Sequence, residues 1–147
     1  IFHTLQNGEY VRQCNLPNHA VPKSLALSKD GMLVIYCGQD LLLYSMTINA
    51  TLVAAVDIDE RVNSFAFTSD NQHIILGGEK GNVSIRQVHD LKLKGKHTGK
   101  GVAIRSVMVT PEDCVIAGSQ TGDIAVIAPD NTQQQRTNRS SRSWSLY

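Results

Sequence analysis

The chain has 147 residues, of which 41% are hydrophobic, and a formal net charge of +1 at neutral pH. This length provides room for one domain with a workable core, and no apolar run is long enough to form a membrane-spanning helix. The near-neutral charge and the aromatic content of 5% argue against nucleic-acid binding, which would need a clustered basic face with interleaved aromatic side chains.

The sequence consists of repeated units of short predicted strands, and it begins in the middle of one of these units. Residues 1–3, 7–12 and 18–21 resemble the second half of a WD40 repeat, in which a Gly-Glu turn, here Gly8-Glu9, leads to the fourth strand. Three further units follow, and the last of them is also incomplete. Packed units of this kind need neighbours on both sides. We therefore expect this chain to be a piece of a longer protein, with the missing units upstream.

The three further units repeat at a spacing of roughly 40 residues. Each opens with a short strand in which large and small side chains alternate, at residues 24–27, 64–67 and 106–109. This alternation predicts one bulky and one small face on each first strand. The bulky residues are Leu25, Leu27, Phe65, Phe67, Val107 and Val109. We expect Phe67 to be buried between neighbouring sheets.

A polar turn and an apolar second strand follow in each unit, at residues 33–36, 74–76 and 115–117. These second strands lack alternation, which is typical of a strand that is packed on both faces. A glycine-bearing turn comes next, and Gly81 and Gly122 are expected to adopt the positive φ of a tight hairpin. The first complete unit has a shorter hairpin, so a different turn is predicted at Asp40-Leu41. Four strands per unit and this period are typical of a β-propeller.

Residues 1–128 resemble WD40 repeats. Where that family carries Trp-Asp, successive positions lie 42, 42 and 41 residues apart and are occupied by Phe2-His3, Tyr44-Ser45, Arg86-Gln87 and Ile127-Ala128. The family's Gly-His is matched by Asn18-His19 and more loosely by Lys96-His97. The resemblance implies an all-β, partial WD40-type propeller of about three and a half four-stranded blades. Because every Trp-Asp site differs, the hydrogen-bond tetrad of strong WD40 blades is not expected.

Four strings look similar to the C-terminal propeller of BEACH-domain proteins, in particular the neurobeachin-like branch. They are Leu43-Tyr-Ser-Met46, Val56-Asp-Ile-Asp-Glu-Arg-Val-Asn63, Gly77-Gly-Glu-Lys-Gly81 and Gly101-Val-Ala-Ile-Arg-Ser106. This resemblance implies a large cytoplasmic scaffold that acts in vesicle trafficking. It also implies a BEACH domain before the propeller, outside this chain, and leaves a peripheral association with endomembranes open.

No catalytic, cofactor or metal site is expected. The sequence contains no GxSxG, HExxH or Walker A string, and its five histidines have no ligand spacing. Cys14, Cys37 and Cys114 are odd in number and far apart, which favours reduced structural thiols and a cytosolic location.

Two charged clusters are interpreted as surface features. The acidic residues Asp57, Asp59 and Glu60 are interpreted as a solvated loop between blades. The alternating Lys92, Lys94 and Lys96 are interpreted as outward side chains of an outer edge strand, where their charge blocks pairing with another strand.

The candidate binding site is one rim of the propeller, where loops on a rigid scaffold gather. Lys23, Asn63 and Arg105 hold equivalent positions just before the first strand of each blade. The turns between second and third strands reach the same rim. They contribute Asp40, Glu79, Lys80 and Gln120.

Two parts are therefore predicted: WD40 repeats over residues 1–130, and a disordered polar and basic tail over residues 131–147. The favoured function is a non-enzymatic platform that binds protein partners in membrane traffic. The alternative is a WD40 substrate-recognition adaptor of another pathway, such as a ubiquitin-ligase receptor. A propeller enzyme or metal protein is a weaker third reading, because acid-base and ligand clusters are missing.

Overall fold

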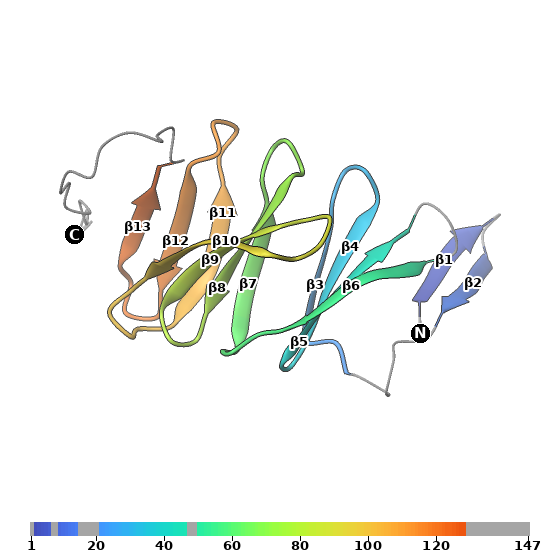
Figure 1. The fold of residues 1–147 in the computed structure, drawn as a ribbon, viewed down its shortest axis with the longest axis horizontal. Coiled ribbons are helices and arrows are strands. Elements are labelled where there is room, and N and C mark those ends of the chain that lie inside the picture. The colour runs from blue at the N-terminus through green and yellow to red at the C-terminus, as the bar shows by residue number, and fades with distance from the viewer. Residues whose placement is uncertain (1, 7–8, 15–20, 47–49, 129–147) are drawn as a thin grey trace.

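The computed structural model describes residues 2–6, 9–14, 21–46 and 50–128, and this part of the chain is built from β-strands and turns alone. Four antiparallel sheets stand side by side in one row (Figure 1). The all-β propeller fold predicted from the repeat is thus confirmed. No helix that could cross a membrane is found among these residues. The predicted tail lies outside the described residues.

The sheets follow the chain, one repeat unit to a sheet. The first is the hairpin of β1 (Phe2–Gln6) and β2 (Glu9–Cys14). The second holds β3 (Ser24–Leu27), β4 (Met32–Cys37), β5 (Asp40–Ser45) and β6 (Thr51–Asp57). The third holds β7 (Val62–Phe67), β8 (His73–Gly78), β9 (Asn82–Gln87) and β10 (Leu93–Thr98). The fourth holds β11 (Ile104–Val109), β12 (Val115–Ser119) and β13 (Ile124–Ile127).

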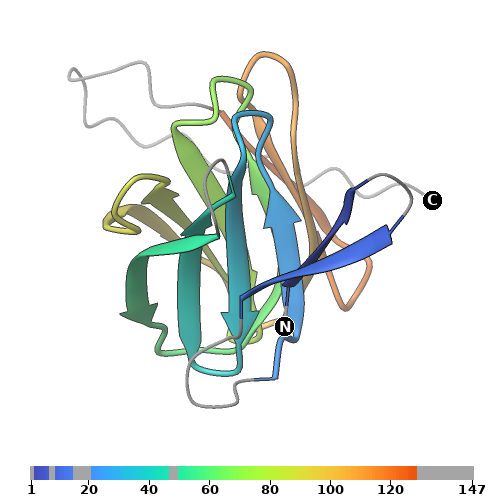
Figure 2. The same cartoon turned by 90° about the vertical axis from the view of Figure 1, so that its right-hand side faces the viewer.

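Within each sheet the strands keep their chain order, so the first and last strands form the two edges. The first strand β7 contacts β3 on one side and β11 on the other, so the three first strands lie along the same side of the row. The outer edges belong to β6 and β10. Seen from the end of the row in Figure 2, the four strands of the β3–β6 sheet stand side by side. The lysine-bearing segment is therefore an outer edge strand, as predicted.

A shared hydroxyl contact closes the turn after each first strand. The side-chain oxygens of Ser28, Thr68 and Thr110 accept a backbone N–H from four or five residues later, at 2.9, 3.0 and 3.2 Å. Ser and Thr are favoured in turns because their hydroxyls can replace a backbone partner in this way. The sequence repeat therefore corresponds to a repeated turn structure.

The core lies between the sheets, and the second strands supply both sides of it. In β8, Ile74 and Leu76 pack toward the β3–β6 sheet, whereas Ile75 packs toward the β11–β13 sheet. Both faces of β4 are also buried, with alternate residues in two separate clusters. Successive side chains of a strand point to opposite faces, so a strand buried on both faces must be apolar throughout. The predicted packing is confirmed for β4 and β8. In β12, Val115 and Ala117 are buried, whereas Ile116 on the other face is only partly buried.

Hairpin geometry agrees with the sequence in two blades and differs in one. Gly81 and Gly122 have φ of 84° and 90°, as predicted. In the β3–β6 sheet, β4 ends at Cys37 and β5 begins at Asp40, so the predicted turn at Asp40-Leu41 is wrong. Gly38, with φ of 89°, begins a two-residue turn instead. A glycine at the first central position is typical of such hairpins.

The bulky faces of the first strands are not equally buried. Val107 is buried, but Phe65 and Phe67 are only partly buried, so the expectation of a fully buried Phe67 is wrong. Leu25 and Leu27 are each 60% exposed. The phenylalanines and valines pack against the preceding sheet of the row. Among the described residues β3 has no four-stranded sheet on that side, which explains its exposure.

A methyl group added at Gly77 tests the packing between sheets. A Cβ there would lie 2.6 Å from Ile104 Cγ2 and 2.9 Å from Val107 Cγ1, across the sheet interface. We expect Gly77→Ala to lower the free energy of unfolding of the intact propeller by about 1–3 kcal/mol in urea denaturation, because an overpacked core must shift. Gly95→Ala on β10 is the control, since nothing lies within 4 Å of its Cβ. Equal stability of the two variants would contradict this packing.

Candidate functional site

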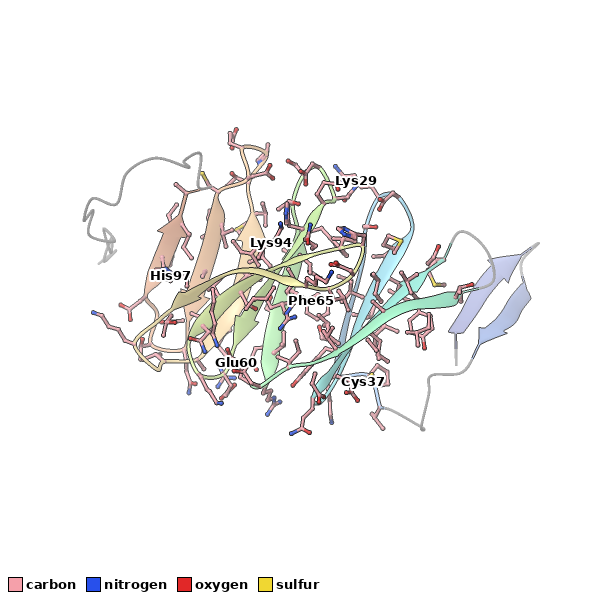
Figure 3. All side chains as sticks on the ribbon, in the orientation of Figure 1. Lys29, Cys37, Glu60, Phe65, Lys94 and His97 are labelled. Atoms are coloured by element: carbon pink, nitrogen blue, oxygen red, sulfur yellow. The ribbon has the colours of Figure 1, made fainter. Side chains whose placement is uncertain are left out.

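The turns of each blade are divided between the two long sides of the row, along which the strands begin and end. Figure 3 shows Cys37 and Glu60 along the lower side and Lys29 along the upper side. The side near Cys37 and Glu60 carries the β4–β5 and β8–β9 turns together with the loops that enter β7 and β11. These are the loops from which the rim residues were predicted. Whether partners dock on this rim stays a prediction.

Four of the seven predicted rim residues form one hydrogen-bond network across two sheets. Asn63 Nδ2 donates to Glu79 Oε2 at 2.7 Å, and Arg105 Nη1 donates to the same oxygen at 3.1 Å. Arg105 Nη2 donates to Gln120 Oε1 at 2.6 Å. Glu79 and Arg105 remain 40% and 46% exposed, so both charges are also accessible to a partner. We refer to these four residues as the rim network.

Backbone contacts hold the rim network in place. The N–H of Glu79 donates to the carbonyl of Arg61 at 2.8 Å, and the N–H of Gln120 donates to the carbonyl of Ala103 at 2.9 Å. Each bond ties a turn to the loop that enters the same blade. Asn63 Nδ2 also donates to the carbonyl of Ile104 at 3.0 Å and so links neighbouring sheets. The network therefore presents polar groups from a rigid base, which favours specific binding.

The other three predicted rim residues lie outside this network. Lys23 and Asp40 are exposed on the β3–β6 sheet and are not joined to it. Lys80 belongs to a neighbouring contact, because its Nζ donates to the carbonyl of Asp59 at 2.9 Å and its backbone N–H donates to Glu60 Oε2 at 3.0 Å.

Glu60 is a structural residue that the sequence reading missed. Its side chain is only 7% exposed, so the interpretation of this segment as a solvated loop is wrong at Glu60. Besides the Lys80 N–H, Glu60 accepts a hydrogen bond from Asn82 Nδ2 at 2.7 Å, and Lys96 Nζ lies 4.0 Å away. A buried carboxylate needs such partners. A Cβ at Gly78 would collide with this carboxylate, so the Gly77-Gly78 pair was the available signal.

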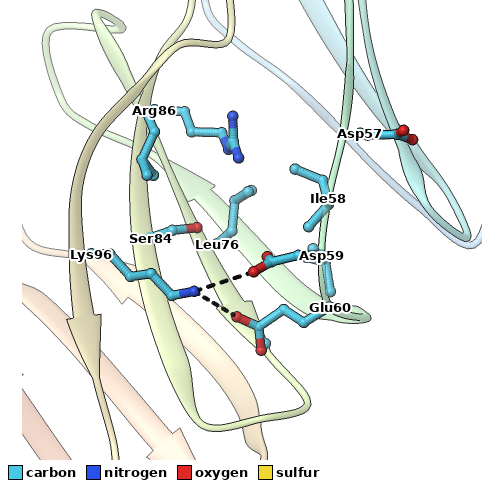
Figure 4. A pocket seen from close by; sticks show the side chains of 11 residues that line it. Asp57, Ile58, Asp59, Glu60, Leu76, Ser84, Arg86 and Lys96 are labelled. Atoms are coloured by element: carbon cyan, nitrogen blue, oxygen red, sulfur yellow. Dashed lines mark ion pairs between the residues drawn. The ribbon is translucent and has the colours of Figure 1, made fainter.

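A pocket of about 190 Å³ lies beside Glu60, between the β6–β7 connection and the outer strands of the β7–β10 sheet (Figure 4). Arg86 enters it and donates from Nη1 to the carbonyl of Leu91 at 2.7 Å. Burial lowers the pKa of Arg86, and the nearby Asp59 opposes this shift. Lys96 Nζ pairs with Asp59 at 3.6 Å across the same pocket. The charges here largely compensate one another, as in a structural ion-pair cluster.

Within the described residues, no three His, Cys, Asp or Glu side chains are gathered in a way that could hold a metal ion. Cys37 and Cys114 are both free and partly buried, and the side chain of Cys14 lies outside the described residues. Burial raises the pKa of the Cys37 thiol, and the negative charge of Asp40 raises it further. The thiol form, which is the less nucleophilic one, is therefore favoured at Cys37.

Comparison with known proteins identifies the family. The neurobeachin β-propeller domain matches residues 1–137 of this chain. The chain belongs to this family. It is 30% identical over 146 residues to BEACH domain-containing protein B of Arabidopsis thaliana, and the match covers 99% of the chain but 6% of that relative. The chain thus corresponds to a small part of that relative.

Solved structures agree on the fold. The chain is similar to Chaetomium thermophilum Sqt1, with a TM-score of 0.71 and 19% identity over 84% of this chain and 36% of that chain. It is similar to the C-terminal WD40 domain of Sif2, with a TM-score of 0.64 and 13% identity over 74% and 34% of the two chains. It is also similar to the computationally designed Ika4 protein, with a TM-score of 0.68 and 14% identity over 82% of this chain and 73% of that chain. WD40 propellers are in general non-catalytic interaction modules.

The Glu60 contacts generate a stability prediction. We expect Glu60→Ala to lower the free energy of unfolding of the intact propeller by about 2–4 kcal/mol, because it leaves the Asn82 amide and the Lys80 backbone N–H without their acceptor. Asp59→Ala is the matched control. Its carboxylate is 76% exposed, and an exposed ion pair contributes about 0–1 kcal/mol. Chemical denaturation measures both, and a larger loss for Asp59→Ala would show that Glu60 does not hold the loop.

Proposed function

We propose that this chain is part of a non-enzymatic docking propeller in a BEACH-domain scaffold that recruits protein partners during vesicle trafficking. The observation that supports it best is the rim network, in which exposed charged groups rest on two packed sheets. Membership in the neurobeachin propeller family supports the scaffold context. A cytoplasmic location, peripheral to endomembranes, belongs to the same proposal. The substrate-adaptor alternative has no comparable support.

The rim network suits protein binding for two physical reasons. Arg105 offers a planar guanidinium whose geometry matches carboxylates, and arginine is enriched among residues that dominate interfaces. Its contacts with Glu79 and Gln120 fix the side chain before a partner arrives, which reduces the entropy lost on binding. The neighbouring Glu79 carboxylate adds a charge of opposite sign, so the rim can select partners by their charge pattern.

The structure refines which substitutions can test the rim. Asn63 supports the sheet interface, so replacing it would change stability as well as binding. Arg105→Ala with Lys23→Ala avoids this problem, because both side chains are exposed. We expect this double variant of the full-length protein to lose specific partners in quantitative affinity purification, with a melting temperature within about 2 °C of the wild type.

The control for that experiment is Lys92→Ala with Lys94→Ala, which removes the same amount of charge from the outer edge of the β7–β10 sheet. The control should retain the partners that the rim variant loses. Identical partner sets for the two double variants would remove the rim as the docking surface. If the purified partners include no component of endomembrane traffic, the trafficking part of the proposal fails while the rim result stands.

A further inference from the structure

The outer edge strands of the two four-stranded sheets differ in charge. In the β7–β10 sheet, the exposed Lys92 and Lys94 lie beside and in the edge strand β10, whereas Lys96 pairs with Asp59 and Glu60. The edge strand β6 has the sequence Thr-Leu-Val-Ala-Ala-Val-Asp and contains no lysine, arginine or proline. Lysine and proline are the usual means of blocking an edge against another strand. Within one chain, therefore, one edge is protected and the other is open.

The backbone of β6 has unused hydrogen-bonding groups along this edge. Ile58 N–H donates to the carbonyl of Gln39 at 2.7 Å, which fixes the phase of the β5–β6 ladder. Because alternate residues of an antiparallel strand bond to the same neighbour, the N–H and C=O groups of Ala55 and Asp57 point away from β5. Beside them, Leu52 and Val53 are 43% and 48% exposed.

The end of β6 also carries an uncompensated charge. Asp57 lies directly opposite Asp40 of β5 in the strand register. Both carboxylates are exposed, and neither forms an ion pair within residues 21–46 and 50–128. Like charges directly opposite on neighbouring strands destabilise a sheet. A basic side chain on a strand added next to Asp57 would relieve this repulsion.

We propose that β6 is a strand-addition site that binds an extended segment of a partner protein, with an uncharged run of β-branched residues and a basic residue at its amino-terminal end. Unpaired backbone groups recognise an extended strand and no other backbone conformation. Antiparallel addition, the more stable arrangement, places the amino-terminal residue of the segment beside Asp57. This surface lies on the perimeter of the propeller and is independent of the rim network.

The test uses the full-length protein and a labelled heptapeptide that has arginine first, followed by alternating threonine and valine. We expect saturable binding in fluorescence anisotropy. The same peptide with N-methyl groups on alternate residues should bind at least about tenfold more weakly, because its ladder hydrogen bonds are blocked. Equal binding of the two peptides, or no binding of the first, would overturn the proposal.

Two protein variants locate the site. Ala55→Pro removes an N–H that points away from β5, and proline is tolerated at such edge positions, so binding should fall at least about tenfold while the melting temperature changes little. Thr98→Pro on β10 is the matched control. The Gly99 N–H bond to the Gly81 carbonyl at 3.1 Å places the Thr98 N–H on the open side as well. An equal loss for both variants would contradict a site on β6.

The charge part of the proposal has its own readout. Asp57→Asn should weaken binding of the arginine peptide by about two- to fivefold and leave binding of a peptide with threonine at the first position unchanged. An equal effect on both peptides would show that Asp57 does not recognise the basic residue of the peptide.

Sedimentation of the protein without peptide tests whether a second copy of the chain occupies the β6 edge. Self-association that Ala55→Pro abolishes would assign the edge to a second copy and overturn the proposed partner.

Discussion

The whole arrangement depends on burying the apolar second strands between neighbouring sheets, on both faces in β4 and β8. A sheet with two apolar faces is insoluble alone and becomes stable only when neighbouring sheets cover it. In β8, Ile74, Ile75 and Leu76 are almost fully buried between two sheets. Each such side chain contributes about 1.5–3 kcal/mol when it leaves water. The row of sheets in Figure 1 is the geometric result of this requirement.

This packing also positions the polar groups. Because Gly77 allows the sheets to approach closely at Ile104, Asn63 can reach across the interface to the Ile104 carbonyl. The rim network is built on that contact. At the outer side, Glu60 fixes the loop that joins two sheets, using Lys80 of the β8–β9 turn and Asn82 at the start of β9 as donors. Rigid placement of exposed charges on the rim is thus a consequence of the apolar core beneath it.

The repeat allowed most of the fold to be predicted. Alternation in the first strands, the apolar second strands and the turn glycines Gly81 and Gly122 are local signals, and their recurrence in successive units indicated the propeller. The turn at Gly38 was missed because a two-residue hairpin needs its glycine one position after the strand rather than at its far end. Burial of the first strands could not be read locally, since it depends on the neighbouring sheet.

The loop positions of the candidate site could be predicted from the repeat, but the contacts between its side chains could not. Equivalent loop positions indicated Asn63 and Arg105, because the repeat superimposes them. The contacts that join them to Glu79 and Gln120 cross between turns that are distant in sequence. Glu60 was misread because an acidic residue in a polar loop resembles surface until its donors are known. The open edge of β6 required strand order, which periodicity alone does not provide.

Hydrogen–deuterium exchange of the intact propeller tests the central claim most directly. If burial of both faces of the second strands holds the blades together, the amides of β8 exchange only through global unfolding. They should then be at least about a hundredfold slower than those of the outer strand β10, where alternate N–H groups face solvent. Exchange of β8 at the same rate as β10 would contradict the claim.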